Sequence, residues 1–203
     1  MSGEAKQGGY FSLYLLIGLT IAMTVAMLGL SFWKLDLSAP TLDSLPPIER
    51  ARTKIAERNP GLPLDAWRHT ESNGVLEVTI KSSLLFNLEP LRGISIQSLR
   101  LQEVRVSDLA PLAGSASLKE FECSDDPLLQ SVEPLRGLPE LQKLNIIGTS
   151  VTDLSPLMEC PDLDEIMGDN ELLLSSDHLK QHPNADRMRL NGQRLDQFFE
   201  QSD

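Results

Sequence analysis

The sequence is poor in cysteine, in aromatic side chains and in positive charge. Its two cysteines cannot build a disulfide framework or a four-thiolate zinc site. Aromatic residues make up only 5% of the 203 residues, so the hydrophobic fraction of 41% is mainly aliphatic, with leucine the commonest residue. The 18 Lys and Arg stand against 29 Asp and Glu, a net charge of −11, which argues against nucleic acid as a partner.

Charged side chains are also missing from one continuous stretch, between Gln7 and Trp33. At about 1.5 Å per residue, a helix over residues 10–33 extends roughly 36 Å, enough to cross a hydrocarbon core of about 30 Å. The alternative is a cleaved signal peptide, but the preceding residues 1–9 carry a single lysine and the apolar core is too long. We therefore predict an uncleaved transmembrane helix in contact with membrane lipid.

Small residues recur at every fourth position of this predicted helix, at Gly18, Ala22 and Ala26. Such a stripe lets two helix backbones approach closely, which predicts a homodimer through the membrane segment. The alternative is that small residues are simply common in membrane helices. A lysine flanks each end of the helix, so the positive-inside rule does not decide its orientation in the membrane.

A proline-containing tether over residues 34–46 follows, and then a soluble helix within the segment 47–69. The prolines at its start suit a first helical turn, and Asn59-Pro60-Gly61 ends it. Its predicted buried side consists of Ile48, Ala51, Ile55 and Ala56. About three turns are too few for an isolated helix, so we expect it to cap the next unit. Its basic face is expected to be solvated, with anionic lipid as the alternative contact.

An internal repeat dominates the rest of the chain. Pro-Leu recurs at Pro90, Pro111, Pro134 and Pro156, with spacings of 21, 23 and 22 residues. An L-x-x-L-x-L pattern accompanies it and predicts a short strand with one buried face in each repeat: Ile96-Leu99-Leu101, Leu118-Phe121-Cys123, Leu141-Leu144-Ile146 and Leu163-Ile166-Gly168. Degenerate end units are predicted at Val75-Val78-Ile80 and Ala185-Met188-Leu190.

Two further sets of equivalent positions, which we call columns, recur once in each repeat with the same spacing. The first predicts side chains that cap short helical turns: Asn87, Asp108, Ser131, Asp153 and Ser175. The second is aliphatic: Leu85, Val106, Leu129, Val151 and Leu173. Together the columns predict an α/β leucine-rich repeat solenoid over residues 70–192. Its parallel sheet would lie on the concave face and short helical or 3-10 turns on the convex face, followed by a tail over residues 193–203.

The segments 106–112 and 148–157 resemble leucine-rich repeats of the short bacterial type. They are similar to the repeats found outside the membrane in some bacterial receptor-type serine/threonine kinases, and the likeness covers residues 47–203. This resemblance implies an extracytoplasmic repeat domain with a role in signalling. Such kinases carry a catalytic domain before the membrane helix, whereas here nine residues precede Tyr10, and no G-x-G-x-x-G, H-R-D or D-F-G motif occurs. We therefore expect no enzymatic activity and no cofactor.

Other candidate chemistry is sparse. His178 and His182 are four residues apart, with Asp177 or Asp186 as a third metal ligand, but without an H-E-x-x-H motif a polar C-terminal turn is favoured and no metal is expected.

The remaining candidates also have a plain structural reading. Cys123 and Cys160 are predicted to be small buried hydrophobic residues in different layers. Asp125-Asp126 is predicted to form a solvated acidic loop, with cation binding as the alternative.

Outward strand residues are the better candidate site, because solenoids commonly bind partners on this face. One predicted row is Glu77, Ser98, Glu120, Lys143, Glu165 and Arg187, and the other is Thr79, Arg100, Glu122, Asn145, Met167 and Arg189. The predicted partner-binding residues are Arg100, Glu120, Glu122, Lys143, Glu165, Met167, Arg187 and Arg189. The signs of charge alternate, so the alternative is that neighbouring strands neutralise one another.

The sequence thus predicts a single-pass protein of the cell membrane, with a non-catalytic interaction or sensor domain outside the cytoplasm and a protein partner. One alternative is the sensory subunit of a serine/threonine kinase system. Another, from a different class, is a structural envelope protein in which the repeats act as a spacer.

Overall fold

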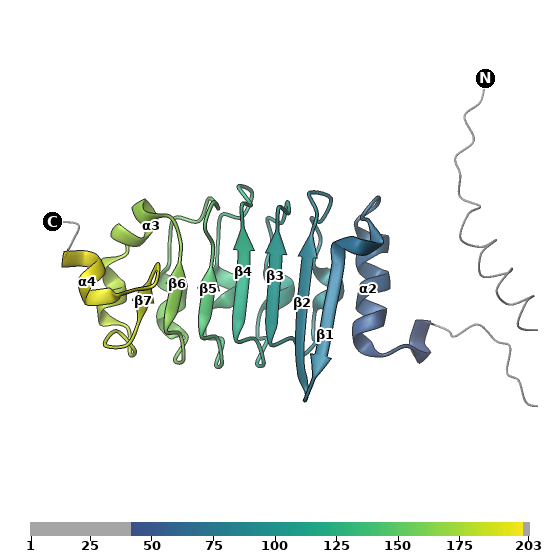
Figure 1. Ribbon diagram of the computed structural model, residues 1–203, viewed down its shortest axis with the longest axis horizontal. Helices are drawn as coiled ribbons and strands as arrows, with labels where there is room; N and C mark the ends of the chain where they lie inside the picture. The colour runs from purple at the N-terminus through teal and green to yellow at the C-terminus, as the bar shows by residue number, and fades with distance from the viewer. Residues whose placement is uncertain (1–41, 201–203) are drawn as a thin grey trace, which may run out of the picture. The chain divides into compact units, whose positions relative to one another are not determined.

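A computed structural model describes residues 42–200, and Figure 1 shows the arrangement of their helices and strands. The predicted membrane helix, its small-residue stripe and most of the tether lie outside these residues. Among residues 42–200, no helix is both long and apolar enough to cross a membrane.

One open sheet of eight strands, ordered as in the sequence, organises the fold (Figure 1). Strands β2 to β7 are parallel, and the two end pairs, β1 with β2 and β7 with β8, are antiparallel. The strands are β1 (Trp67–Ser72), β2 (Val75–Lys81), β3 (Ser98–Gln102), β4 (Glu120–Ser124), β5 (Lys143–Asn145), β6 (Glu165–Met167), β7 (Arg189–Leu190) and β8 (Gln193–Arg194). The fold is therefore α/β with a mostly parallel sheet, an arrangement compatible with a solenoid.

Strand pairing follows the predicted repeat from β3 to β6. Leu99 pairs with Phe121, Phe121 with Leu144, and Leu144 with Ile166, and all four side chains are buried. Equivalent repeat positions therefore stack on one another, so each repeat buries its aliphatic side chains against the next. At roughly 1.5–3 kcal/mol for each buried aliphatic side chain, this stacking stabilises a core with few aromatic residues.

The Pro-Leu segments form 3-10 turns between the strands, at Glu89–Leu91, Ala110–Leu112, Glu133–Leu135 and Ser155–Glu159. Four of the five predicted capping side chains accept a hydrogen bond from the backbone N–H two residues later, at 2.7–3.1 Å: Asn87, Asp108, Ser131 and Asp153. The prediction for Ser175 was wrong. A short helix, α3 (Asn170–Leu174), occupies this repeat, so Ser175 follows a helix end and its hydroxyl donates to the Leu172 carbonyl at 2.8 Å.

The N-terminal end of the sheet is capped by α2 (Pro47–Arg58), as predicted, with Ile48, Ala51 and Ile55 buried. Ala56 is only partly buried. Asn59, which the sequence suggested only as a helix stop, is fully buried and joins the helix to the first repeat. Its Nδ2 donates to the carbonyls of Ile55 and Asn87 at 2.8 and 3.0 Å, and its Oδ1 accepts the N–H groups of Phe86 and Asn87, both at 2.8 Å.

Both ends of the sheet are β-hairpins rather than the simple degenerate repeats predicted. Asn73-Gly74 joins β1 to β2 and Asn191-Gly192 joins β7 to β8, and all four residues have positive φ, which suits the tight turns of hairpins. The first hairpin overturns the placement of Val75, which is 43% exposed while Leu76 is buried. Val75 already lies within β2, where alternation assigns residues 76, 78 and 80 to the core.

At the C-terminal end, strand β7 pairs two residues further along the chain than the sequence pattern predicted. The predicted alignment places Met188 opposite Ile166, whereas the partner of Ile166 is Leu190. Asn191 holds this register, because its side chain donates to the Gly168 carbonyl at 3.0 Å and accepts the Gly168 N–H at 3.1 Å. Helix α4 (Leu195–Glu200) ends the described chain, within the predicted tail, with Leu195 and Phe198 buried.

Candidate functional site

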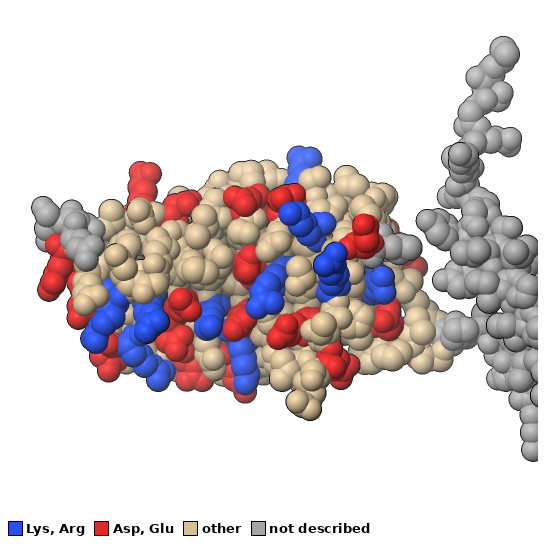
Figure 2. Space-filling model, viewed as in Figure 1, with Lys and Arg blue, Asp and Glu red and all other residues tan. Residues whose placement is uncertain are grey.

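The outward residues of β2 to β7 form two rows across the sheet, which we call the strand face. The first row is Glu77, Ser98, Glu120, Lys143, Glu165 and Arg189, and the second is Thr79, Arg100, Glu122, Asn145 and Met167. Figure 2 shows basic and acidic side chains interspersed on the side where the strands lie.

Arg100 on β3 is the centre of an ion-pair cluster on this face. Its guanidinium lies 3.1 Å from the Glu120 carboxylate, 3.7 Å from Glu122 and 3.9 Å from Glu77. Lys143 on β5 continues the cluster, 3.7 Å from Glu120 and 3.9 Å from Glu165. Neighbouring strands therefore partly neutralise one another, and half-exposed pairs of this kind contribute little to stability.

A hollow of about 260 Å³ opens on the strand face over β3 to β6. Its lining residues are Arg100, Glu120, Phe121, Glu122, Lys143, Leu144, Asn145, Glu165 and Met167. Six of the eight predicted partner-binding residues therefore surround one concavity. Three carboxylates and two cations converge there, with the Met167 thioether as an apolar group.

The two remaining predicted residues are not where the sequence placed them. Because the β7 register is shifted, Arg189 belongs to the first row, opposite Glu165, and not to the second. Arg187 precedes β7, so its predicted position on a strand was wrong. Ser98 does lie in the predicted row, but it is buried rather than available to a partner. Gly18, Ala22 and Ala26 lie outside the described residues.

The histidine pair does not form part of a metal-binding cluster. Within residues 42–200, no three His, Cys, Asp or Glu side chains are grouped so as to hold a metal ion. His182 is buried, not a polar residue of an exposed turn. Its Nδ1 accepts the Asn184 N–H at 3.0 Å, so Nε2, 3.1 Å from the Cys160 carbonyl, carries the proton.

Burial lowers the pKa of His182, against the opposing effect of its hydrogen bond to Cys160. At pH values above the ordinary histidine pKa of about 6.5, His182 adds no pH dependence to the free energy of unfolding. At lower pH, the unfolded chain binds a proton at this residue that the folded chain does not. We therefore expect stability to fall on acidification, by up to about 1.4 kcal/mol per pH unit for one proton. Urea midpoints between neutral and mildly acidic pH should fall less steeply for His182→Gln. An identical slope in that variant would contradict the prediction.

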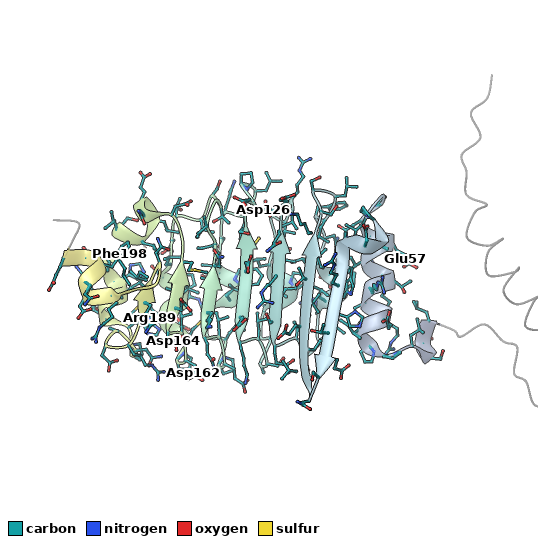
Figure 3. All side chains as sticks on the ribbon, in the orientation of Figure 1. Glu57, Asp126, Asp162, Asp164, Arg189 and Phe198 are labelled. Atoms are coloured by element: carbon teal, nitrogen blue, oxygen red, sulfur yellow. The ribbon has the colours of Figure 1, made fainter. Side chains whose placement is uncertain are left out.

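Asp126 corrects a second expectation. It lies fully buried instead of in a solvated loop, with Oδ2 accepting the Val106 N–H at 2.7 Å and Oδ1 accepting the Leu128 N–H at 3.0 Å. Figure 3 labels this residue. The prediction that Cys123 and Cys160 are buried is confirmed, and both are free thiols. Burial raises the pKa of both thiols, and the Asp126 carboxylate raises that of Cys123 further, so neither cysteine is a reactive thiolate.

No protein-family model matches this sequence, and a search of curated proteins finds no significant match.

Proposed function

We propose that this chain is a membrane-anchored leucine-rich repeat protein, and that its strand face binds a protein partner as a non-catalytic interaction or sensor module. The repeat columns, stacked in register from β3 to β6, support the leucine-rich repeat assignment. The uncharged stretch over residues 10–33 supports the membrane anchor, and the resemblance to bacterial receptor kinases supports an extracytoplasmic location. The hollow over β3 to β6 is the observation that supports binding.

The chemistry of the hollow suits a polar polypeptide. Its carboxylates and cations, at the distances given above, offer both donors and acceptors to a partner. The Lys143 ammonium lies 3.7 and 3.9 Å from its two carboxylates, beyond hydrogen-bond distance, so a competing group from a partner has little to displace. No aromatic side chain projects as an anchor from the two rows, which favours a charge-matched partner of modest affinity.

Photocrosslinking in cells tests this proposal. Benzoylphenylalanine replaces Met167, which lines the hollow, or Phe86, an exposed residue outside it. We expect a discrete protein adduct from position 167 and none of the same size from position 86. Lys143→Glu should reduce the adduct about tenfold or more, because it replaces a cation of the hollow with a fourth negative charge beside its three glutamates. Lys54→Glu on α2 is the matched control and should leave the adduct unchanged.

No adduct at position 167, or equal adducts at both positions, would favour the structural-spacer alternative. Co-purification of the adduct with a kinase would favour the sensory-subunit alternative. In the same cells, protease cleavage of a C-terminal tag without lysis of the inner membrane is expected for an extracytoplasmic domain, whereas a tag exposed only by full lysis would contradict that location.

A further inference from the structure

Three arginines gather where the strand face ends. Arg189 on β7 and Arg194 on β8 are directly opposite each other in the antiparallel hairpin, and Arg187 lies two residues before Arg189, where β7 begins. All three side chains are exposed. We call this group the arginine end; Figure 2 shows several basic side chains, with acidic ones among them, at this end of the sheet, and Figure 3 labels Arg189 there.

The pairing of Arg189 with Arg194 is unfavourable for the isolated protein. Directly opposed residues of antiparallel strands have Cβ atoms about 4.5–5.5 Å apart and point to the same face, so two like charges repel. The hairpin cannot relieve this by slipping, because Asn191 in its turn is tied to Gly168 and Asn170 by side-chain hydrogen bonds of 2.9–3.1 Å.

The described chain does not neutralise these charges as it neutralises the centre of the strand face. Only Arg194 is paired, with its Nε 3.4 Å from Asp196 and its Nη2 donating to the Asp186 carbonyl at 3.2 Å. The guanidinium groups of Arg187 and Arg189 make no ion pair or hydrogen bond with another residue of the range 42–200. Arg189 lies opposite Glu165 in strand register, yet Glu165 pairs with Lys143 on its other side.

We propose that the arginine end binds a carboxylate-rich segment of the protein partner, an inference that rests on the proposed interaction function of the strand face. Guanidinium groups pair with carboxylates through two parallel hydrogen bonds, so an acidic segment would replace the repulsion with charge-assisted contacts. The site continues the first row of the strand face, so one extended partner can contact both the hollow and the arginine end. A nucleic acid is disfavoured because it needs many phosphate contacts, and the arginine end offers three cations on a chain with a net charge of −11.

The test measures binding of a defined probe to the full chain in detergent micelles. The probe is a short fluorescein-labelled peptide with Glu at alternate positions, and its matched control has Gln at those positions. Fluorescence anisotropy should show binding of the Glu peptide, none of the Gln peptide, and weaker binding as ionic strength rises. Arg187→Gln with Arg189→Gln should weaken binding about tenfold or more, as expected for loss of charged hydrogen bonds.

The matched control variant, Arg50→Gln with Lys54→Gln, removes the same net charge from α2 and should bind the Glu peptide as the wild type does. Equal weakening by both double variants, absence of binding, or tighter binding of a single-stranded oligonucleotide of similar charge would each overturn the inference. The crosslink at position 167 separates the two proposals: a retained adduct without peptide binding refutes only the arginine end, and peptide binding without an adduct refutes only the hollow.

Discussion

Phe121→Ala is expected to lower the free energy of unfolding by about 3–5 kcal/mol, the usual range for removing a buried phenylalanine from a core. Phe121 lies on β4, is 1% exposed and is the largest of the fully buried side chains among the described residues. It is stacked in register between Leu99 and Leu144, so truncation leaves a cavity at both interfaces of its repeat. Urea denaturation of the full chain in nonionic detergent, followed by circular dichroism, measures the change.

Phe121→Leu is the matched control, because leucine already stands at the equivalent position of both neighbouring repeats. We expect this substitution to lower the unfolding free energy by less than about 1.5 kcal/mol, since it largely conserves volume. Each strand pairs only with its neighbours in sequence, so the alanine variant should also show a broadened transition as the two ends uncouple. Equal losses in the two variants would contradict the packing role assigned to the ring.

Asn59→Ala is expected to lower the unfolding free energy by about 3 kcal/mol, because leaving buried polar groups unpaired costs about 1–3 kcal/mol each. The truncation leaves the N–H groups of Phe86 and Asn87 and the carbonyl of Asn87 without their partner. These bonds join α2 to the first repeat. The contact between α2 and the sheet should therefore be lost at a lower urea concentration than the sheet itself. The fluorescence of the buried Trp67 on β1 reports unfolding at this end of the sheet. A Trp33→Phe background leaves Trp67 as the single tryptophan of the chain.

We expect the Trp67 fluorescence transition of Asn59→Ala to move to lower urea than its circular dichroism transition. Asn87→Ala serves as the control, since within residues 42–200 its side chain makes only the turn hydrogen bond, in which Oδ1 accepts the Glu89 N–H. Loss of that bond should cost about 1 kcal/mol. Coincident transitions in Asn59→Ala, with a loss no greater than that of Asn87→Ala, would contradict the joining role of Asn59.

Sequence patterns predicted the central repeats well because the same contacts recur there. The leucine positions, the four turn-capping side chains and the inward cysteines each occupy a column whose members meet their counterparts in the next repeat. The patterns were less informative at Asp126, where an inserted residue breaks the column. The Asp126 carboxylate is buried there because it accepts hydrogen bonds from two backbone N–H groups, those of Leu128 and of Val106 in the preceding repeat.

The end hairpins show a signal that sequence reasoning overlooked. Asn73-Gly74 and Asn191-Gly192 are Asn-Gly pairs between strand-like segments, which is a strong local indication of a hairpin turn. Attention to the repeat period favoured continuing parallel strands to both ends. The turn chemistry instead reverses the chain, and α2 and α4 then lie beyond the first and last strands (Figure 1).

Repeat spacing and alternation were therefore sufficient to establish the central strands β3 to β6, their order and which of their side chains face inward, because each repeat buries its own aliphatic residues against an equivalent neighbour. They were insufficient for the register of β7, since a slip of two residues leaves every inward side chain inward. That register depends on the hydrogen bonds between Asn191 and Gly168, residues in different repeats. The hollow likewise forms between side chains about one repeat apart in the sequence, and the opposed arginines come from the two strands of a hairpin. Both sets of side chains come together only in the folded sheet.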